Sequence, residues 1–300
     1  MKYIFGPVPS RRLGSSLGID IVPAKTCNLD CIYCEVGRTN KLTNKRDSYI
    51  NIEEMINELK IAYNSLKDNI DVVTITGSGE PTLNKDIEII VQRVKELINH
   101  PLVLLTNSTL LTDDEVKKGV LNFDIIVPSI DAVSEEIFYK VNRPHKKLNL
   151  KEILEHLKSF SYTFTGELNI EVLIVKGVND GYDELKKIAS YIKDLKYNKV
   201  QINTVFRPPA YPDAVRLSDS ELLEIAIFFK KEGIRVEPVK NFMKNLKIED
   251  NNYHTYIKSI LEMRPCTAKD LSSIFDLTED ELMENIKRLN NVISYKHNNE

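Results

Sequence analysis

Three of the four cysteines in this 300-residue chain lie in one short stretch, Cys27, Cys31 and Cys34, with the spacing C-x3-C-x2-C. Thiolate is a soft ligand that holds the irons of iron-sulfur clusters. A cube of four irons needs one ligand on each iron, so three thiolates leave one iron open to a small molecule. Cys266 lies far along the chain. We therefore predict a 4Fe-4S cluster held by Cys27, Cys31 and Cys34, with chemistry at its open iron.

Two other structures fit three neighbouring cysteines, a zinc knuckle and a disulfide with a spare thiol. Structural zinc usually takes four ligands, and no fourth Cys or His lies within about twenty residues of this stretch. We therefore prefer the cluster to both alternatives.

A second motif strengthens this prediction. The cysteine spacing, with the aromatic Tyr33 directly before the third cysteine, resembles the signature of the radical S-adenosylmethionine (SAM) superfamily. The segment Gly77-Ser78-Gly79-Glu80-Pro81 resembles that superfamily's Gly-Gly-Glu-Pro motif, with Ser78 in place of the first glycine. The resemblance implies that the amine and carboxylate of SAM chelate the open iron, that these residues position the methionine end, and that a ferredoxin or flavodoxin supplies electrons.

Alternating strand and helix patterns must position these motifs. Alternation this regular predicts an α/β fold with parallel strands, but it leaves open a closed barrel or a doubly wound sheet. The resemblance implies a partial (β/α)6 barrel. After a turn-rich opening, we expect strands at 17–22, 71–76, 102–106, 124–130, 168–175, 199–205 and 234–236. We expect helices at 52–66, 87–98, 112–121 (opened by Thr112), 133–140, 149–160, 182–195 and 218–231.

Ligands of parallel α/β folds collect at the carboxyl ends of the strands, which adds polar candidates for SAM. The hydroxyl, amide and carboxylate groups there offer hydrogen bonds to a ribose, although the same residue types also cap helices. The resemblance places adenine near the end of the fifth strand, where Lys176 is available to neutralise a carboxylate. The added candidates are Thr106, Asn107, Ser129, Asp131, Val175 and Lys176.

Basic residues in loops at the same end are candidates for contact with a substrate. Solvated loop charge is the simpler interpretation for any one of them. The candidates are Arg11, Arg12, Arg143, His145 and Arg207. The sequence assigns no catalytic residue and no role to Cys266.

Composition indicates the class of protein and its cellular compartment. The chain is 42% hydrophobic and 28% charged with a net charge of −3, as in a soluble globular protein. No apolar run reaches the roughly 18 residues of a membrane span, and the start resembles no secretory signal. We therefore expect a cytoplasmic protein, which suits free thiols.

A polar stretch near residue 245 suggests two domains, a barrel over 1–240 and a small helical domain over 250–300 that resembles a winged helix. Residues 245–300 carry ten acidic and seven basic side chains. Because phosphate repels such a segment, a DNA-binding iron-sulfur sensor is the weakest of three hypotheses.

The leading hypothesis is an enzyme that cleaves SAM to a 5′-deoxyadenosyl radical and abstracts hydrogen from a macromolecule. Segments such as FGPVPSRRLGSSLGID and KGVND resemble proteins grouped beside the wyosine tRNA-base synthetases, which makes tRNA the first candidate. Those synthetases carry further cysteines that this chain lacks, so their reaction is not implied. The remaining hypothesis is a protein or peptide modifier of the glycyl-radical activase type.

Overall fold

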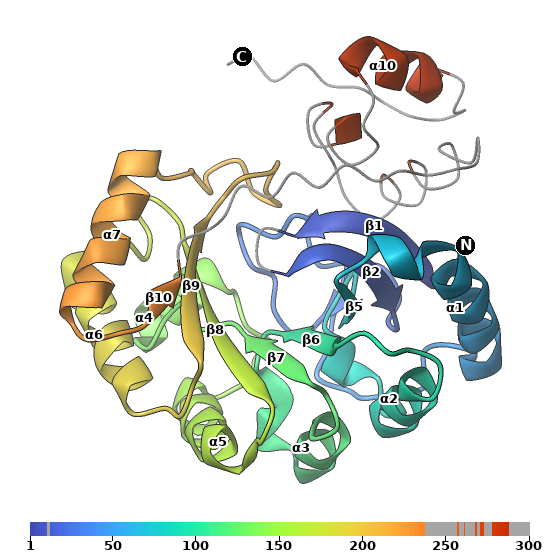
Figure 1. Cartoon of the computed structure of the whole chain (residues 1–300). Helices are drawn as coiled ribbons and strands as arrows, with labels where there is room; N and C mark the ends of the chain where they lie inside the picture. The colour runs from blue at the N-terminus through green and yellow to red at the C-terminus, as the bar shows by residue number, and fades with distance from the viewer. Residues whose placement is uncertain are drawn as a thin grey trace.

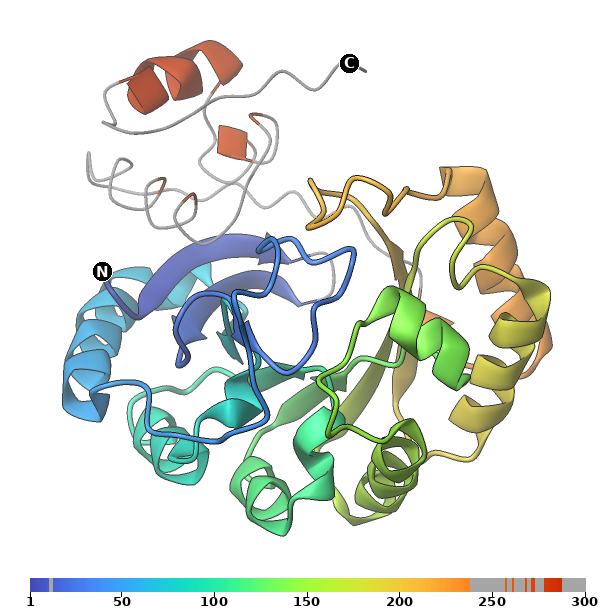
Figure 2. The same cartoon turned by 180° about the vertical axis from the view of Figure 1, so that it is seen from behind.

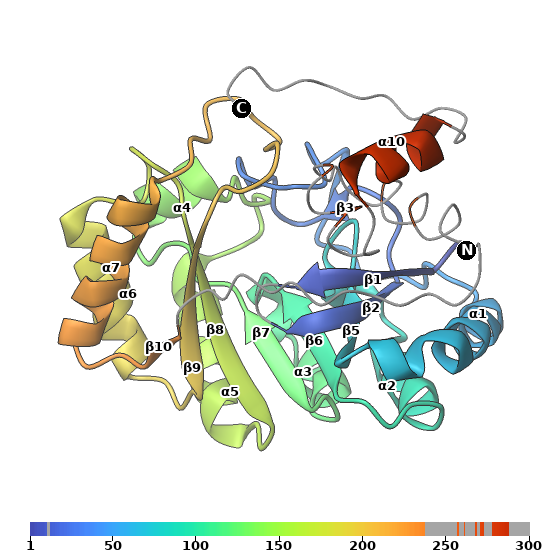
Figure 3. The same cartoon turned by 45° about the horizontal axis from the view of Figure 1, so that its top comes forward.

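The computed structural model describes residues 1–10, 13–237, 257, 261, 268, 271–272 and 278–287. Its main sheet has eight strands in the order β1-β2-β5-β6-β7-β8-β9-β10. Neighbouring strands are parallel except β1 and β2. The sheet curves with helices on its outer side and stays open between β1 and β10 (Figures 1 and 3). The fold is therefore a partial barrel, as the resemblance implied.

The strands are β1 Ile4–Ser10, β2 Gly14–Asp20, β3 Thr26–Cys27, β4 Lys41–Leu42, β5 Val72–Thr76, β6 Leu102–Thr106, β7 Ile125–Pro128, β8 Glu167–Ile174, β9 Lys199–Thr204 and β10 Val236–Glu237. The α-helices are α1 Ile52–Leu66, α2 Ile87–Lys95, α3 Asp114–Val120, α4 Glu135–Val141, α5 Leu150–Thr163, α6 Tyr182–Lys193, α7 Asp219–Lys231 and α10 Glu279–Lys287. Short 3-10 helices span Lys67–Asn69, Pro81–Leu83 and Thr109–Thr112.

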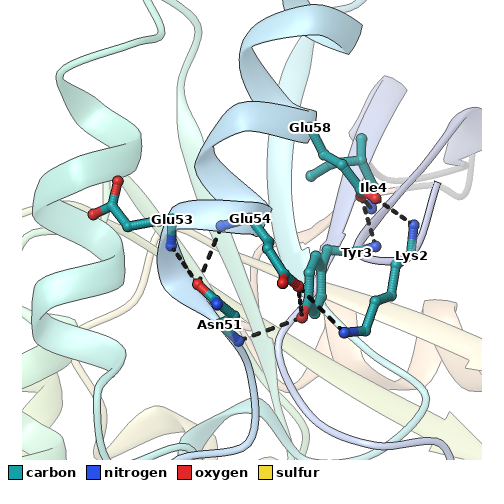
Figure 4. Close-up of polar contacts among 7 residues, drawn as sticks. All are labelled: Lys2, Tyr3, Ile4, Asn51, Glu53, Glu54 and Glu58. Atoms are coloured by element: carbon teal, nitrogen blue, oxygen red, sulfur yellow. Dashed lines mark hydrogen bonds and ion pairs between the residues drawn. The ribbon is translucent and has the colours of Figure 1, made fainter.

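The opening of the chain differs from the prediction. The turn-rich segment forms β1, which pairs antiparallel with β2 and tolerates prolines because it is an edge strand. Glu58 of α1 accepts hydrogen bonds from the backbone N–H groups of Lys2 and Tyr3, at 2.7 and 2.8 Å (Figure 4). The Tyr3 hydroxyl donates to Glu54 at 3.1 Å. A buried edge strand needs such partners for its free donors, and they come from a helix about fifty residues away.

A second difference concerns α3. Thr112 does not open this helix, because the side chain of Asp113 accepts the N–H groups of Glu115 and Val116. Asp and Thr are both good caps, and the cap falls one residue later than predicted.

The two faces of the sheet have different contents. On β8, Leu168, Ile170, Val172 and Ile174 belong to the main core, together with apolar residues of the outer helices. Because successive side chains alternate between faces, residues 167, 169, 171 and 173 line the inner face of the barrel, which we call the lumen. Along β6 and β7 the lumen is apolar and holds Val103 and Val127, and on β5 Val72 shares the inner face with Thr74 and Thr76.

The predicted winged helix over 250–300 lies mostly outside the described residues. Its last predicted helix includes α10, where Thr278 accepts the N–H of Glu281 at 3.3 Å and caps the first turn. Within the described ranges, no helix combines the length and apolar character that a membrane crossing requires.

Candidate functional site

The three cysteines lie on the long segment between β2 and α1. Short strands β3 and β4 pair in parallel and close this segment on itself. Figure 2 shows the segment in blue, between the β1–β2 hairpin and the green helix α4. Backbone hydrogen bonds from Asp30 and Ile32 to Asn142 and Val141 join it to the end of α4. The cysteine loop is therefore anchored at the carboxyl ends of the strands.

The thiols of Cys27, Cys31 and Cys34 are free and share one environment. The Nδ2 of Asn107 donates to the Sγ of Cys27 at 3.6 Å, and the Nδ2 of Asn142 donates to the Sγ of Cys31 at 3.3 Å. Such bonds stabilise thiolate ligands and tune the potential of a cluster. Burial raises the pKa of Cys27 to about 12, so a metal must displace the proton when it binds.

This donor set fits an iron-sulfur cube better than a single ion. No group of three or more His, Cys, Asp or Glu side chains within the described ranges is arranged to hold one metal ion. In a cube each thiolate binds a different iron, so the three sulfurs need not converge on one point. Three soft donors with N–H···S support are therefore suited to a cluster.

The loop after β5, which carries Gly77 to Glu80, is bound to the start of the cysteine segment. Lys25 N–H donates to the carbonyl of Ser78 at 2.5 Å, and Glu80 N–H donates to the carbonyl of Thr26 at 3.1 Å. A Cβ atom on Gly79 would collide with the Thr26 carbonyl. Glycine is required at this position because two backbones approach each other closely.

Ser78, which replaces the motif's first glycine, has a partner that the sequence did not suggest. Its hydroxyl donates to the carboxylate of Asp20 at 2.6 Å, and its N–H donates to the same oxygen at 3.2 Å. Burial raises the pKa of Asp20 while these bonds oppose the rise. The serine therefore compensates a buried carboxylate at the end of β2. Only the unusual Asp at the end of an apolar strand could have indicated this.

Glu80 is only 3% exposed and connects two loops. Its Oε1 accepts the hydroxyls of Thr82 and Thr106 at 2.6 and 2.7 Å. Its Oε2 accepts the N–H of Asn107 at 2.8 Å. Burial raises the pKa of Glu80, and these hydrogen bonds oppose the rise. Glu80 thus fixes the loop after β6 relative to the loop after β5.

Asn107 links this pair of loops to the cysteines. Besides Cys27, its Nδ2 donates to the Oδ1 of Asn28 at 2.8 Å, while its own Oδ1 accepts the hydroxyl of Thr109 at 2.7 Å. The fully buried Asn28 donates in turn to Thr109 at 2.7 Å. Asn28 was not predicted, although its place directly after Cys27 was a signal.

Asp131 and Tyr33, predicted independently, are in contact. The Tyr33 hydroxyl and the Nδ2 of Asn142 both donate to the Oδ2 of Asp131, the second at 2.7 Å. The N–H of Leu173 donates to its Oδ1 at 3.0 Å. Burial raises the pKa of Asp131 to about 6, against the effect of these donors. Asn142, which contacts both Asp131 and Cys31, was not predicted, although the sequence Asn142-Arg143-Pro144-His145 was noted for its two basic side chains.

The SAM candidates Ser129, Val175 and Lys176, which follow β7 and β8, differ in their hydrogen-bond and ion-pair partners. The carbonyl of Ser129 accepts the hydroxyl of Ser108 at 3.0 Å. Val175 is buried, and its N–H donates to the Oδ1 of Asn179 at 2.7 Å. The ammonium of Lys176 lies 2.7 Å from Glu221 of α7. The structure thus places Lys176 in an ion pair with α7, and its contact with SAM stays a prediction.

Three substrate candidates, Arg143, His145 and Arg207, contact the cysteine segment or the loops that pack on it. The guanidinium of Arg143 lies 3.9 Å from the ring centre of Tyr211, and Arg38 lies 4.3 Å from it. Arg207 pairs with Glu35 at 2.6 Å. His145 donates its N–H to the carbonyl of Asn28 at 2.9 Å. These residues therefore also hold two loops against the cysteine segment. Arg11, Arg12 and Cys266 lie outside the described residues.

Comparison with known proteins agrees with this geometry. The family model of the radical SAM superfamily matches residues 21–192. A UPF0026 protein of Helicobacter pylori is 36% identical over 275 residues, which cover 91% of this chain and 88% of the relative. A probable dual-specificity RNA methyltransferase RlmN of Thermotoga petrophila is 25% identical over 216 residues, 70% of this chain and 61% of that protein.

The fold has solved counterparts. A radical SAM methyltransferase from Sphaerobacter thermophilus superposes with a TM-score of 0.60 at 16% identity, over 74% of this chain and 66% of that one. At this identity the likeness concerns the fold alone. The family match and the UPF0026 relative show that the chain belongs to the radical SAM superfamily and, within it, to the UPF0026 proteins. The fold is consistent with this assignment.

Proposed function

We propose that the protein is a radical SAM enzyme that abstracts a hydrogen atom from RNA, with tRNA as the first candidate. The observation that carries the radical assignment is the direct connection of the cysteine loop to the Glu80 loop through Asn107 and Thr26. Cys27, Cys31 and Cys34 would hold the 4Fe-4S cluster. Cluster and SAM together supply a 5′-deoxyadenosyl radical, which side chains cannot provide.

The residues of the chain position and enclose this chemistry. Glu80 and Asn107 fix the loops on which the methionine end of SAM would lie, and Asp131 with Asn142 fixes the loops near its ribose. Preorganised loops reduce the entropy lost on binding and align the reacting atoms. The buried surroundings of Asp131 exclude water, which protects a radical from side reactions.

RNA is proposed as substrate on two grounds. One relative at 25% identity has the printed name of an RNA methyltransferase. The loop Arg143 to Lys147 also adds basic side chains beside the cysteine segment, suited to phosphate.

Deuterium transfer tests the substrate directly. Total RNA and total protein are prepared from cells grown in deuterated medium, and each is incubated anaerobically with reconstituted protein, SAM and reductant. We expect deuterium in the 5′-deoxyadenosine formed with the RNA fraction, as measured by mass spectrometry. Deuterium transfer only from the protein fraction would contradict RNA and support the peptide-modifying hypothesis.

A further inference from the structure

The lumen face of β8 and β9 carries three amide side chains, unlike the apolar lumen face of β6 and β7. Gln201 and Asn203 alternate with Val200 and Ile202, which lie in the outer core, so both amides face the lumen. Asn169 of β8 lies on the same inner face. Its parallel partner on β9 is Lys199. We call Asn169, Gln201 and Asn203 the amide wall.

Hydrogen bonds fix which way each amide points. The NH2 groups of Asn169, Gln201 and Asn203 donate to carboxylates, at 2.9, 3.2 and 2.9 Å, and the three acceptors are Glu167, Glu237 and Glu171. An ionised carboxylate only accepts hydrogen bonds, so exchanging the O and N atoms of the amides would bring acceptors together. The three carbonyl oxygens therefore point elsewhere, and each lacks a hydrogen-bond partner among the residues that the structure describes.

These oxygens are buried as well as unpartnered. Asn169, Gln201 and Asn203 are 1%, 3% and 8% exposed. A buried acceptor without a partner destabilises a fold, and three on adjacent strands form one surface. Such a surface gains free energy from a ligand that donates hydrogen bonds.

Charge narrows the chemistry of that ligand. Three carboxylates accept hydrogen bonds from the amide wall, and within the described residues Lys199 lies 2.9 Å from Glu237 and 3.5 Å from Glu167. Carbonyl oxygens beside carboxylates at a poorly solvated site disfavour phosphate and carboxylate groups. The ligand group is therefore neutral or cationic.

Gln201 and Asn203 of the amide wall lie level with the candidate SAM residues, and Asn169 lies deeper in the barrel, level with Lys199. Ser129 after β7 forms a bridge with Glu171, and Glu171 pairs with Gln201 on the next strand. Asp131 receives a hydrogen bond from Leu173, whose partner on β9 is Asn203. A group bound at the amide wall would therefore lie at the depth where the radical forms.

The rim on the cysteine side carries the opposite charge. Arg38, Lys146 and Lys147 are exposed and Arg143 is partly exposed, and none of the four has a carboxylate partner within the described part of the chain. The acids nearest to them are already engaged, Asp30 with Tyr211 and Glu35 with Arg207. A basic rim attracts a phosphate backbone and repels a cationic peptide.

We propose that the amide wall recognises the N–H edge of a nucleobase that enters the lumen while its phosphates remain on the basic rim. Enzymes that modify a base commonly take it out of the stack and bind its Watson–Crick edge. The buried carbonyl oxygens favour a group with several N–H donors. Guanine presents the most N–H donors on that edge and uracil presents one. This inference rests on the proposed function for its substrate class.

Equilibrium dialysis of cluster-loaded protein with guanosine, uridine and agmatine, each with SAM present, tests the proposal. We expect guanosine to bind at least about tenfold more tightly than uridine. Gln201→Met and Asn203→Leu keep side-chain volume but remove the carbonyl, and each should lower guanosine affinity at least about tenfold with SAM affinity unchanged. Ile202→Val, on the outer face of the same strand, is the matched control.

Several results would overturn the proposal. Equal affinities of guanosine in the wild type and both wall variants would show that the wall is structural, and no binding of guanosine up to 10 mM counts as this result. A parallel loss of SAM affinity would assign the wall to the cofactor. Tighter binding of agmatine, a guanidinium cation, than of guanosine would indicate an arginine side chain of a peptide. None of these measurements needs radical chemistry, so they stand apart from the deuterium-transfer test.

Discussion

The cysteine-side loops and the amide wall differ in whether their buried polar atoms have hydrogen-bond partners. Around the cysteines, the side chains of Glu80, Asn107 and Asp131 all have hydrogen-bond partners from neighbouring loops. On the amide wall, three carbonyl oxygens have no partner within the described part of the chain. A satisfied network makes a rigid scaffold, whereas unpartnered acceptors lower stability until a ligand donates to them. On our proposals, the first region holds the cofactor in place and the second receives the substrate.

The largest effect should come from the cysteines themselves. A Cys27→Ala/Cys31→Ala/Cys34→Ala variant should lose the cluster completely, because each iron of a cube needs its own ligand. Iron and sulfide analysis after anaerobic reconstitution measures this. Cys266→Ala serves as the control and should keep full iron content. Full cluster content in the triple variant would remove the metal site from the cysteine loop.

Glu80 tests how far the cysteine-side network positions SAM. Glu80→Ala removes charge-assisted hydrogen bonds, each worth about 1.5–3 kcal/mol, so SAM affinity should fall at least about tenfold. Glu80→Gln, which keeps an acceptor, should lose less. Glu88→Ala on the surface of α2 is the control. Equilibrium dialysis with labelled SAM decides, and an unchanged affinity in Glu80→Ala would mean that the network does not hold the cofactor.

One substitution type should have unequal effects in the two regions. Asn28→Leu breaks a satisfied buried network and should destabilise the protein by about 1–3 kcal/mol. Asn169→Leu breaks one hydrogen bond to Glu167 but also removes an unpartnered carbonyl, so it should cost less than Asn28→Leu and lower Tm by at most roughly 2–4 °C for a domain of this size. Thermal unfolding of the cluster-free proteins measures both. If both substitutions lower Tm equally, the contrast between the regions is wrong.

The smallest expected effect concerns Lys176. It pairs with Glu221 in a partly exposed ion pair, and such pairs contribute less than about 1 kcal/mol. Lys176→Met should therefore leave SAM affinity unchanged within about twofold. A tenfold loss would make Lys176 a ligand of SAM, as the sequence suggested.

The same substitution has a pH signature. Lys176, together with Ser218, lowers the pKa of Glu221 from its model-compound value of 4.5 to about 2. A carboxyl with a lowered pKa stabilises the fold above its unfolded pKa, and this stabilisation is lost as pH falls from about 4.5 to about 2. In Lys176→Met, stability should fall less steeply with acid over that range, as chemical denaturation at several pH values would show.

Patterns within short stretches of the sequence predicted the elements that depend only on neighbouring residues. The strands β5 to β9 and the cysteine motif follow from apolar runs and spacing, so they were found close to their observed positions. The strand β1 was missed because Gly6-Pro7-Val8-Pro9 indicates a turn, whereas this segment pairs with β2. Asp20, Asn28 and Asn142 were missed because their roles depend on partners that only the fold brings together.

The amide wall also could not be predicted in full from the sequence. Alternating polar residues on β8 and β9 were visible in the sequence, but only the structure shows that their NH2 groups are used and their carbonyl oxygens are not.

The most direct test of the account is cleavage of SAM without substrate. Reconstituted protein with a full cluster, reduced anaerobically and mixed with SAM, should slowly form 5′-deoxyadenosine and methionine in equal amounts, as quantified by liquid chromatography and mass spectrometry. The Cys27→Ala/Cys31→Ala/Cys34→Ala variant should form neither. Complete recovery of intact SAM from the fully loaded, reduced protein, with no binding of SAM in dialysis, would contradict the account.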